Sequence, residues 1–345
     1  MAAACGHGQE AIRDPYDPPT DVRARVGDTV VVRSRVGIGE LVLQRLGHDS
    51  VVLRDGGGTR RVEAVAPPPE GNYALQFFGT GSGDVDRVKI RVDDPVEGLP
   101  PRHADIGNGD FTIEFWLRAP PGANRAAPVT CGENVAWIGG NIVLDRDRYN
   151  AGRKFGLSLA GGQVVFGVTA DTDAHRTICG RRRVDDGRWH HVAVTRAIVS
   201  GELHLYVDGA LEAGPETGPP GDISYPDRAI PGDFCRGPCT RSDPYLVLGA
   251  EKHDVGPDYP AFSGELDELR LSSAIRYAGP YQIPSSAFVP DSATAALYHF
   301  DEGAGDMLRD AAWPAREASP GYLRVGGARQ GPRWVLSDAP TARRP

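Results

Sequence analysis

The residues best suited to chemistry are three carboxylates in one short stretch. Glu265 and Asp267 lie two positions apart, and Glu268 follows directly. Alternate residues of a β-strand face the same side of a sheet, so Glu265 and Asp267 would share a face while Glu268 points the other way. Two carboxylates on one face, about 5–5.5 Å apart, are what a retaining glycoside hydrolase needs. This stretch is therefore the first place to test for a carbohydrate-cleaving function.

Asp267 also raises a question of burial. It alternates with Leu269 and Leu271, which predicts an inward-facing carboxylate. Such a group is costly to bury unless it is paired, hydrogen-bonded or bound to a metal. Two turn-like Asp-x-Asp pairs offer further oxygen ligands, namely Asp84 with Asp86 and Asp171 with Asp173. Because calcium takes six to eight oxygens, these five aspartates are the candidate metal ligands. The alternatives are backbone hydrogen bonds for Asp267 and solvated turns for the pairs.

Four of the five cysteines lie in the main body of the chain and can form disulfides. Cys235 and Cys239 enclose Arg-Gly-Pro, a bend suited to a local bridge, which leaves Cys131 and Cys179 to close a long loop. Two bridges indicate an oxidising compartment. Free buried thiols in a cytosolic protein are the alternative. A zinc site is less favoured, because no second pair of Cys or His has ligand spacing.

Cys5 follows three alanines and precedes a glycine. Small residues before Cys-Gly resemble the end of a bacterial lipoprotein signal whose hydrophobic part is missing. In that case the mature chain would begin at Cys5 and carry a lipid there. The alternative is an N-terminus with an incidental cysteine. No stretch approaches ~18 uninterrupted apolar residues, so no segment is expected to span a membrane by itself.

Aromatic residues in loops are the candidates for a binding surface. Connections rich in glycine, proline and aspartate carry Trp137, Tyr149, Tyr225, Tyr245 and Tyr259. Rings beside carboxylates or amides are used to contact sugar faces and protein partners, although each ring could equally anchor its loop. Three other large rings fall within strand-like stretches and are expected to fill the interior, namely Trp116, Trp189 and His191.

Composition and charge exclude several classes of protein. The chain has 345 residues, 40% of them hydrophobic, and Gly 44 with Pro 29 indicates many tight turns. A net charge of −8 argues against nucleic acid or an anionic membrane as the main partner. No long helical pattern is present, which disfavours doubly wound α/β enzymes. Nucleophile-elbow, P-loop and kinase motifs are missing as well.

The elements that must position these groups are β-strands in parts of unequal size. Residues 1–20 are polar and proline-rich, which predicts disorder. Residues 21–66 alternate strand-like stretches with hairpin turns, which predicts a small β-rich module. Residues 67–70 form a proline-rich linker. The main domain is then expected over residues 71–338.

Strict alternation marks the strands of the main domain. Apolar residues recur at every second position over 88–92, 111–117 and 203–207, which buries one side of a sheet. Many such strands joined by Gly/Asp turns predict an all-β protein of two antiparallel sheets packed face to face. Only residues 272–277 and 306–312 are expected to form short helical turns.

Four segments in order carry a resemblance to a known family. They are residues 109–118 (GDFTIEFWLR), 186–195 (DGRWHHVAVT) with 205–209, 262–271 (FSGELDELRL) and 296–303 (ALYHFDEG). Together they resemble the laminin-G-like jelly rolls of the concanavalin A-like lectin/glucanase superfamily, over about residues 71–310. The closing segment is similar to domains of bacterial surface proteins and phage tail components. The resemblance implies a jelly-roll sandwich, and it does not cover residues 1–66.

The same resemblance implies a non-catalytic binding role, often with bound calcium placed against an aspartate such as Asp267. Glycosidases of this superfamily carry Glu-x-Asp-x-Glu on one strand, or a variant with one extra residue. Here the third position is Leu269 or Arg270, so the acid/base is missing and the chain is not expected to be an enzyme.

The sequence therefore predicts an extracytoplasmic adhesion module, either secreted or an outer-surface lipoprotein. Its ligand is expected to be a glycan or a surface protein, with calcium as the cofactor that the resemblance implies. The first alternative is a structural subunit of a bacterial surface or phage-like assembly, in which copies of the chain dock on one another. The second is a carbohydrate-active enzyme whose carboxylate pair is assembled in space.

Overall fold

The computed structural model describes residues 21–26, 29–32, 42–45, 51–55, 58–66, 68–79, 86–93, 101–148, 152–171, 174–226, 245–252, 257–314, 317–324 and 332–341. Within these residues the chain is β-structure throughout, apart from one turn of 3-10 helix, η1 (Ala136–Gly139). The short helical turns expected over 272–277 and 306–312 do not form. A strand runs to Ser272 in the first stretch, and another occupies Met307–Leu308 in the second.

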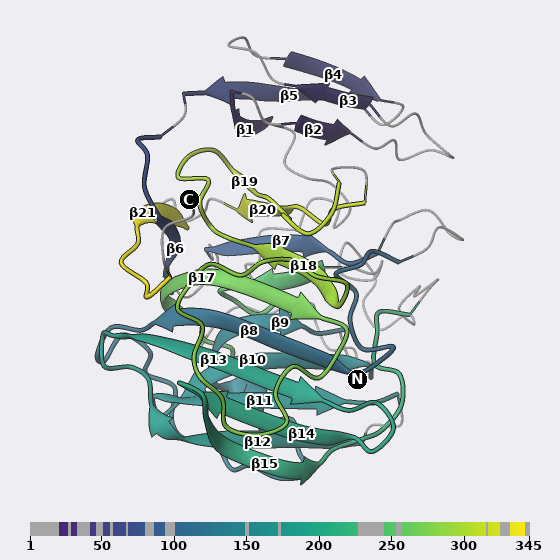
Figure 1. Cartoon of the computed structure of the whole chain (residues 1–345), viewed down its shortest axis with the longest axis vertical. Coiled ribbons are helices and arrows are strands. Elements are labelled where there is room, and N and C mark those ends of the chain that lie inside the picture. Colours follow the sequence, from purple (N-terminus) through teal and green to yellow (C-terminus); the bar gives the residue numbers. More distant parts are fainter. Residues whose placement is uncertain are drawn as a thin grey trace.

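Two antiparallel sheets pack face to face, as the sequence predicts for a jelly-roll sandwich (Figure 1). Sheet I runs in the order β15 (Ala210–Thr217), β14 (Glu202–Val207), β13 (Trp189–Arg196), β8 (Phe111–Arg118), β17 (Ser263–Ser272), β6 (Tyr73–Phe78) and β21 (Arg333–Leu336), and β18 (Thr294–Tyr298) also pairs with β17. Sheet II runs in the order β12 (His175–Arg183), β11 (Gln163–Thr169), β10 (Lys154–Ala160), β9 (Asn141–Arg146), β16 (Tyr245–Leu248), β7 (Arg87–Arg91), β20 (Gly321–Arg324) and β19 (Met307–Leu308).

The core between the sheets is built from the alternating residues that the sequence marks. The predicted inward positions of three strands all belong to one buried cluster: Val88, Ile90 and Val92 from β7 and the residue after it, Phe111, Ile113, Phe115 and Leu117 from β8, and Leu203, Leu205 and Val207 from β14. Removal of these apolar faces from water is the main stabilising contribution to a sandwich of this kind. The predicted alternation is confirmed on each of these strands.

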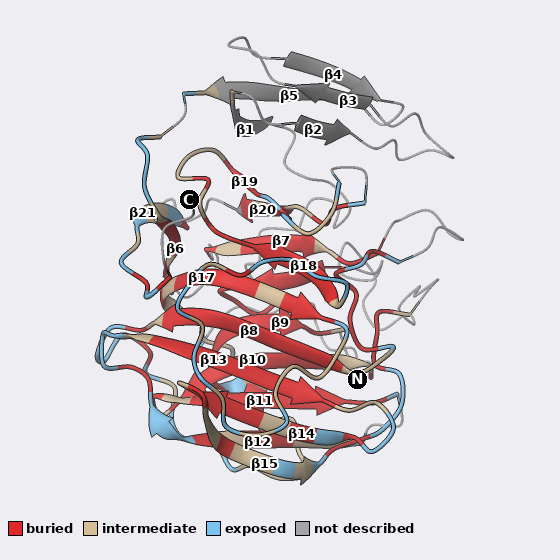
Figure 2. Cartoon of the chain, viewed as in Figure 1, coloured by how far each residue is buried: buried red, intermediate tan, exposed pale blue. Residues whose placement is uncertain are grey.

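The outer face of sheet I is buried as well, which the sequence does not indicate (Figure 2). Thr112, Glu114 and Trp116 of β8 are at most 1% exposed. We call residues 273–293, which connect β17 to β18, the strap, because they cross this face (Figure 1). The hydroxyl of Thr112 donates to the carbonyl of Ala274 (2.6 Å), and the strap reaches as far as the turn after β14. Trp116 and His191 therefore lie beneath the strap rather than between the sheets.

A β-bulge in β17 turns Asp267 to the outer face. The pairing of β17 with β8 shifts register between Asp267 and Arg270, and Glu268 has a positive φ of 49°. Asp267 consequently lies opposite Trp116, while Leu269 keeps its place in the core. The predicted inward direction of Asp267 is wrong, because one extra residue in a strand reverses the faces of all the residues beyond it.

The N-terminal residues form small sheets, as expected for a β-rich module. Five strands are present: β1 (Asp21–Arg25), β2 (Thr29–Val32), β3 (Val42–Arg45), β4 (Val51–Asp55) and β5 (Gly58–Val65). The first pairs in parallel with β5, which also pairs with β4, and β2 pairs with β3. The predicted disordered segment, 1–20, lies outside the described residues.

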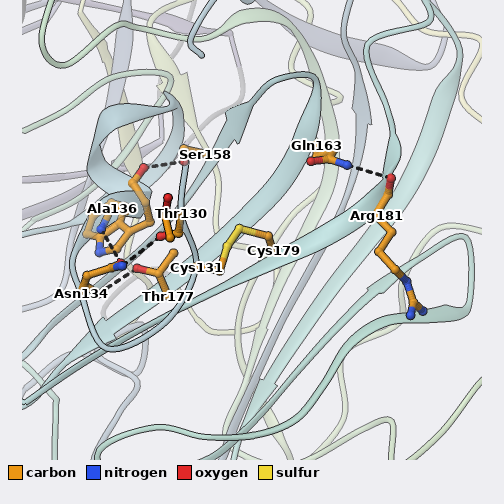
Figure 3. Close-up of a disulfide and its surroundings, with 10 residues drawn as sticks. Thr130, Cys131, Asn134, Ala136, Ser158, Gln163, Thr177, Cys179 and Arg181 are labelled. Carbon is orange, nitrogen blue, oxygen red and sulfur yellow. Dashed lines mark hydrogen bonds between the residues drawn. A yellow bond between two sulfur atoms is a disulfide. The ribbon is translucent and has the colours of Figure 1, made fainter. Parts of the chain in front are cut away.

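A disulfide between Cys131 and Cys179 ties the loop before η1 to β12 (Figure 3). Their Cα atoms are 6.0 Å apart, and 48 positions separate them in the sequence. Close by, the Thr177 hydroxyl donates to the carbonyl of Asn134 (2.8 Å), which fixes the same loop to the same strand. This predicted bridge is confirmed. The other predicted bridge, Cys235 with Cys239, and the lipidation candidate Cys5 lie outside the described residues.

Candidate ligand pocket

A cavity of about 320 Å³ opens at the end of the sandwich where β8 begins and β17 ends. Pockets for small ligands generally occupy about 300–1,000 Å³. Four connections contribute its walls: Pro101, Arg102, His103, Asp105, Ile106, Gly107, Asn108 and Asp110 before β8, Ser273 after β17, Ser292, Thr294 and Ala295 at the start of β18, and Trp313 after β19.

The loop before β8 is held in place by backbone hydrogen bonds. The amide of Arg102 donates to the carbonyl of Val92 (3.0 Å), and the amide of Ile223 donates to the carbonyl of Gly107 (3.0 Å). Gly107 has a φ of +122°, and a Cβ there would lie 2.8 Å from the amide nitrogen of Ser224. A glycine is therefore required for the loop to approach the 223–225 segment this closely.

Two stacked rings stand at the wall of the pocket. The imidazole of His103 and the indole of Trp313 lie nearly parallel, with ring centroids 3.5 Å apart and planes 6° apart. The indole N–H donates to the carbonyl of Ala295 (2.8 Å), which fixes the ring against β18. His103 is exposed and Trp313 is half-buried, so the pair offers a flat apolar surface that a ligand can reach.

Polar groups line the remaining walls. Both carboxylate oxygens of Asp105 accept from the amide of Tyr225 (2.8 and 3.1 Å). Burial raises the pKa of Asp105 to about 7, although the Arg146 guanidinium and the Tyr225 amide oppose this rise. Hydroxyls of Ser273 and Ser292 and the amide of Asn108 line the same cavity. The pocket can thus stack a ring and hydrogen-bond to hydroxyl groups.

Neither ring of this pocket is among the ligand-binding residues predicted from the sequence. Trp313 lies in a loop between aspartate and proline, which is the setting that singled out five other aromatics, so the same criterion would have selected it. His103 lies 210 positions away from Trp313. Only the three-dimensional fold brings the two together.

The predicted aromatic ligand contacts lie elsewhere, and mostly inside the protein. Trp137 is fully buried, and Tyr225 and Tyr245 are 5% and 3% exposed. Tyr259 is half-buried, and Tyr149 lies outside the described residues. The buried rings are used internally, since Tyr245, for example, accepts a hydrogen bond from Arg91 (3.3 Å). A ligand role for these five residues stays a prediction, and our proposal does not use it.

The three predicted metal ligands that the structure describes, Asp267, Asp86 and Asp171, do not form a common cluster. Asp267 Oδ2 accepts from the Ser337 hydroxyl (2.6 Å) and the Asn72 amide (3.3 Å). Asp86 accepts from the amide of Phe78 (3.0 Å), and exposed Asp171 pairs with Arg153 (2.6 Å). In the described part of the chain, no group of three or more His, Cys, Asp or Glu side chains could hold a metal. Asp84 and Asp173 lie outside the described residues. The described donors do not fit calcium, which stays a prediction.

Asp267 is instead a buried acid capped by donors. Burial raises its pKa well above the usual range, the Ser337 hydroxyl opposes this, and the neighbouring charges of Glu268 and Asp301 add to it. The other two carboxylates of β17 are also engaged. Glu265 pairs with Arg118, and Glu268 accepts from His299 (2.9 Å) and from the amide of Phe288 (3.0 Å).

Comparison with known proteins adds one family and several distant relatives. Residues 93–278, more than half of the chain, match the family Laminin_G_3, described as the concanavalin A-like lectin/glucanases superfamily. A mouse protein, "Sushi, von Willebrand factor type A, EGF and pentraxin domain-containing protein 1", is 27% identical over 176 residues, which is 50% of this chain and 4% of that protein. The chain therefore spans only a small part of the curated relatives it matches.

Two solved structures illustrate the likeness of fold. A Bacteroides ovatus protein is 15% identical, with a TM-score of 0.48. The match covers 88% of this chain and 68% of that protein. Domains LG4-5 of the mouse laminin α1 chain are 16% identical, with a TM-score of 0.35, covering 66% of this chain and 49% of theirs. In the part of the chain that the structure describes, no helix is long and apolar enough to cross a bilayer.

Proposed function

Because the chain belongs to the concanavalin A-like lectin/glucanases superfamily, we propose that its sandwich is a non-catalytic module that binds a glycan in the pocket beside Trp313. The observation that carries this proposal is the stacked His103–Trp313 pair at the wall of a cavity of about 320 Å³. A sugar presents an apolar ring face and a rim of hydroxyls, which match the ring surface and the Ser273, Ser292 and Asn108 side chains.

The state of the β17 carboxylates supports binding rather than cleavage. A retaining glycosidase needs one free carboxylate nucleophile beside one protonated acid. Here Glu265 is held by the Arg118 guanidinium and Asp267 is capped by Ser337. Both lie at the opposite end of β8 and β17 from the pocket, so they are not available to a ligand bound beside Trp313.

We also propose that the module works outside the cytoplasm. The Cys131–Cys179 disulfide supports this location, because such bridges persist in oxidising compartments. Lipid attachment at Cys5 remains part of the same proposal. The intact mass of the native protein, measured before and after reduction, reports an acyl chain and the number of bridges together.

A glycan array tests the proposal. The wild-type protein is expected to bind a defined set of glycans, and Trp313→Ala to lose at least tenfold in affinity for them, since stacking on an aromatic ring dominates such contacts. Tyr322→Ala is the matched control, because it removes another half-buried ring from β20 without touching the pocket. Binding to no glycan, or equal binding by the Trp313 variant and the wild type, would contradict the proposal.

A further inference from the structure

A row of four side chains crosses the outer face of sheet I at the end away from the pocket. Gln76 of β6, Glu265 of β17, Arg118 of β8 and Trp189 of β13 are direct neighbours in register. Each is half-buried, whereas the next outward residue of β8, Trp116, is covered. Solvent therefore reaches this row, although the strap buries the middle of the face.

Arg118 is held in position within this row. One terminal nitrogen, Nη2, bonds to Oε2 of Glu265, and the guanidinium carbon lies 4.8 Å from the centre of the Trp189 ring. Its other terminal nitrogen, Nη1, donates to Oδ1 of Asp338 (2.6 Å). The indole N–H of Trp189 donates to the same oxygen (2.8 Å). Two donors from neighbouring strands thus converge on one carboxylate oxygen, and we call Arg118 and Trp189 the clasp.

The carboxylate in the clasp comes from the C-terminal tail and is held at the surface. The Asp338 side chain is 77% exposed. It follows β21, and the amide of Ser337 donates to the carbonyl of Asn72 (2.9 Å) just before it. Hydrogen bonds from Trp189 and Arg118 hold the pKa of Asp338 below its ordinary value, so both donors favour the charged form. Exposed ion pairs contribute little stability, so another carboxylate can exchange with this one.

We propose that the clasp is a second binding site, which takes the carboxylate of a uronic-acid sugar, and that Asp338 occupies it until the ligand displaces it. The row continues from the clasp into Glu265 and Gln76, whose oxygen and nitrogen atoms suit the hydroxyls of a sugar. The clasp holds one cation flanked by Glu265, which suits a ligand whose carboxylates are spaced one to a ring over a peptide whose carboxylates lie on adjacent residues. A sugar acid brings one carboxylate per ring together with hydroxyls.

This site is separate from the pocket and does not depend on it. The pocket lies where β8 begins and the clasp lies where β8 ends, so the length of the strand, about 24 Å, separates them. A variant of one site can therefore be used as a control for the other.

Calorimetric titration with trigalacturonic acid, against its fully methyl-esterified form, tests the proposal. The acid should bind and the ester should not, because only the acid carries charged carboxylates. Asp338→Asn replaces the charged competitor in the clasp with a neutral amide and should tighten binding about two- to fivefold. The double variant Arg118→Gln, Glu265→Gln should lose at least tenfold, and leaves neither residue with an unpaired charge. Tyr322→Ala, which belongs to neither site, should bind the acid as the wild type does.

Several outcomes would overturn the proposal. The first is that the acid and the ester bind equally well. The second is that the acid binds neither the wild type nor Asp338→Asn. The third is that Trp313→Ala abolishes binding of the acid while the double variant still binds it. Tighter binding of an aspartate-containing hexapeptide than of trigalacturonic acid would identify the clasp as a peptide site instead. Thermal unfolding of each variant verifies that the sandwich is intact, and Asp338→Ala provides a second substitution that empties the clasp.

Discussion

Trp137 shows how one buried ring determines the identity of its neighbours. The ring lies against two strands of sheet II at positions where both carry glycine. A Cβ at Gly167 would lie 1.9 Å from Trp137 Cδ1, and one at Gly156 would lie 2.1 Å from Cζ3. Glycines within strands otherwise weaken a sheet, so this pair is explained by the space that the indole needs.

Gly167→Ala is therefore expected to lower the free energy of unfolding by about 1–3 kcal/mol, because a closely packed core does not accept an added methyl group without strain. Urea denaturation measures the change. Gly109→Ala is the control, since a Cβ there meets no atom within 4 Å, and its cost should stay within about 0.5 kcal/mol. Equal costs at the two positions would show that the ring does not require the glycine.

Asp105 is expected to make stability depend on pH in an unusual direction. Burial raises its pKa to about 7 from 3.8, so between these values the folded state binds more protons than the unfolded state. The wild type should therefore lose stability as the pH rises through this window. Asp105→Asn lacks the titration, so its stability relative to the wild type should increase between pH 4 and pH 8, by up to about 4 kcal/mol.

Urea unfolding of both proteins at pH 4, 6 and 8 measures this difference. A difference between Asp105→Asn and the wild type that does not change with pH would show that Asp105 titrates normally.

At the scale of elements, the strap is attached to sheet I through Glu114. This carboxylate is fully buried, and it accepts from Arg270 Nε (2.8 Å) and from the Tyr277 hydroxyl of the strap (2.6 Å). His191 lies 3.4 Å away, and its other ring nitrogen contacts the hydroxyl of Tyr281 (2.9 Å). One buried acid therefore joins Tyr277 of the strap to Arg270 and His191 of sheet I, and His191 in turn contacts Tyr281.

Glu114→Gln should lower the free energy of unfolding by about 3–5 kcal/mol, because it leaves the Arg270 guanidinium inside the protein without a countercharge. Despite burial, His191 and Arg270 hold the pKa of Glu114 below its ordinary value, so its contribution is present at neutral pH and is lost as the pH falls below about 4. The partly exposed Glu202 provides the control: Glu202→Gln should change stability by less than about 0.5 kcal/mol. A small effect of Glu114→Gln in chemical denaturation would mean that the strap is held by its rings alone.

Local pattern predicted most of the strands and little of what covers them. Val88, Ile113 and Leu205 alternate with polar neighbours, and because that period reflects local geometry, their inward direction could be read from sequence. The bulge at Glu268 adds one residue to β17 that alternation alone does not reveal, so no local pattern indicates that Asp267 faces outward. The pocket depends on contacts between connections far apart in the chain, which no local pattern encodes.

At the scale of the whole molecule, the sandwich separates two surfaces of different character. The pocket combines a ring pair with hydroxyls and the buried Asp105 carboxyl, and the clasp combines a guanidinium with an indole N–H. Within the described residues, the strap covers the middle of the face between them, and the two surfaces lie at opposite ends of sheet I. The clasp side chains lie on strands β8 and β13, whereas the pocket is walled by connections that backbone hydrogen bonds hold in place, so both are ordered before a ligand arrives.

The disulfide is expected to stabilise the whole sandwich. Cys131 and Cys179 close a loop of 48 positions, and the double variant to serine should lower the free energy of unfolding by about 2–4 kcal/mol, chiefly because the unfolded chain gains freedom. Denaturation of the oxidised wild type, the reduced wild type and the double variant measures this. The last two should agree, and agreement of all three would contradict the expectation.

Titration calorimetry of a neutral glycan selected on the array decides whether the pocket binds its ligand or cleaves it, because the heat reports binding and turnover in the same experiment. We expect a saturating binding isotherm without sustained heat, which Trp313→Ala abolishes and Glu265→Gln leaves unchanged. Sustained heat from bond cleavage, lost in the Glu265→Gln variant, would contradict this expectation.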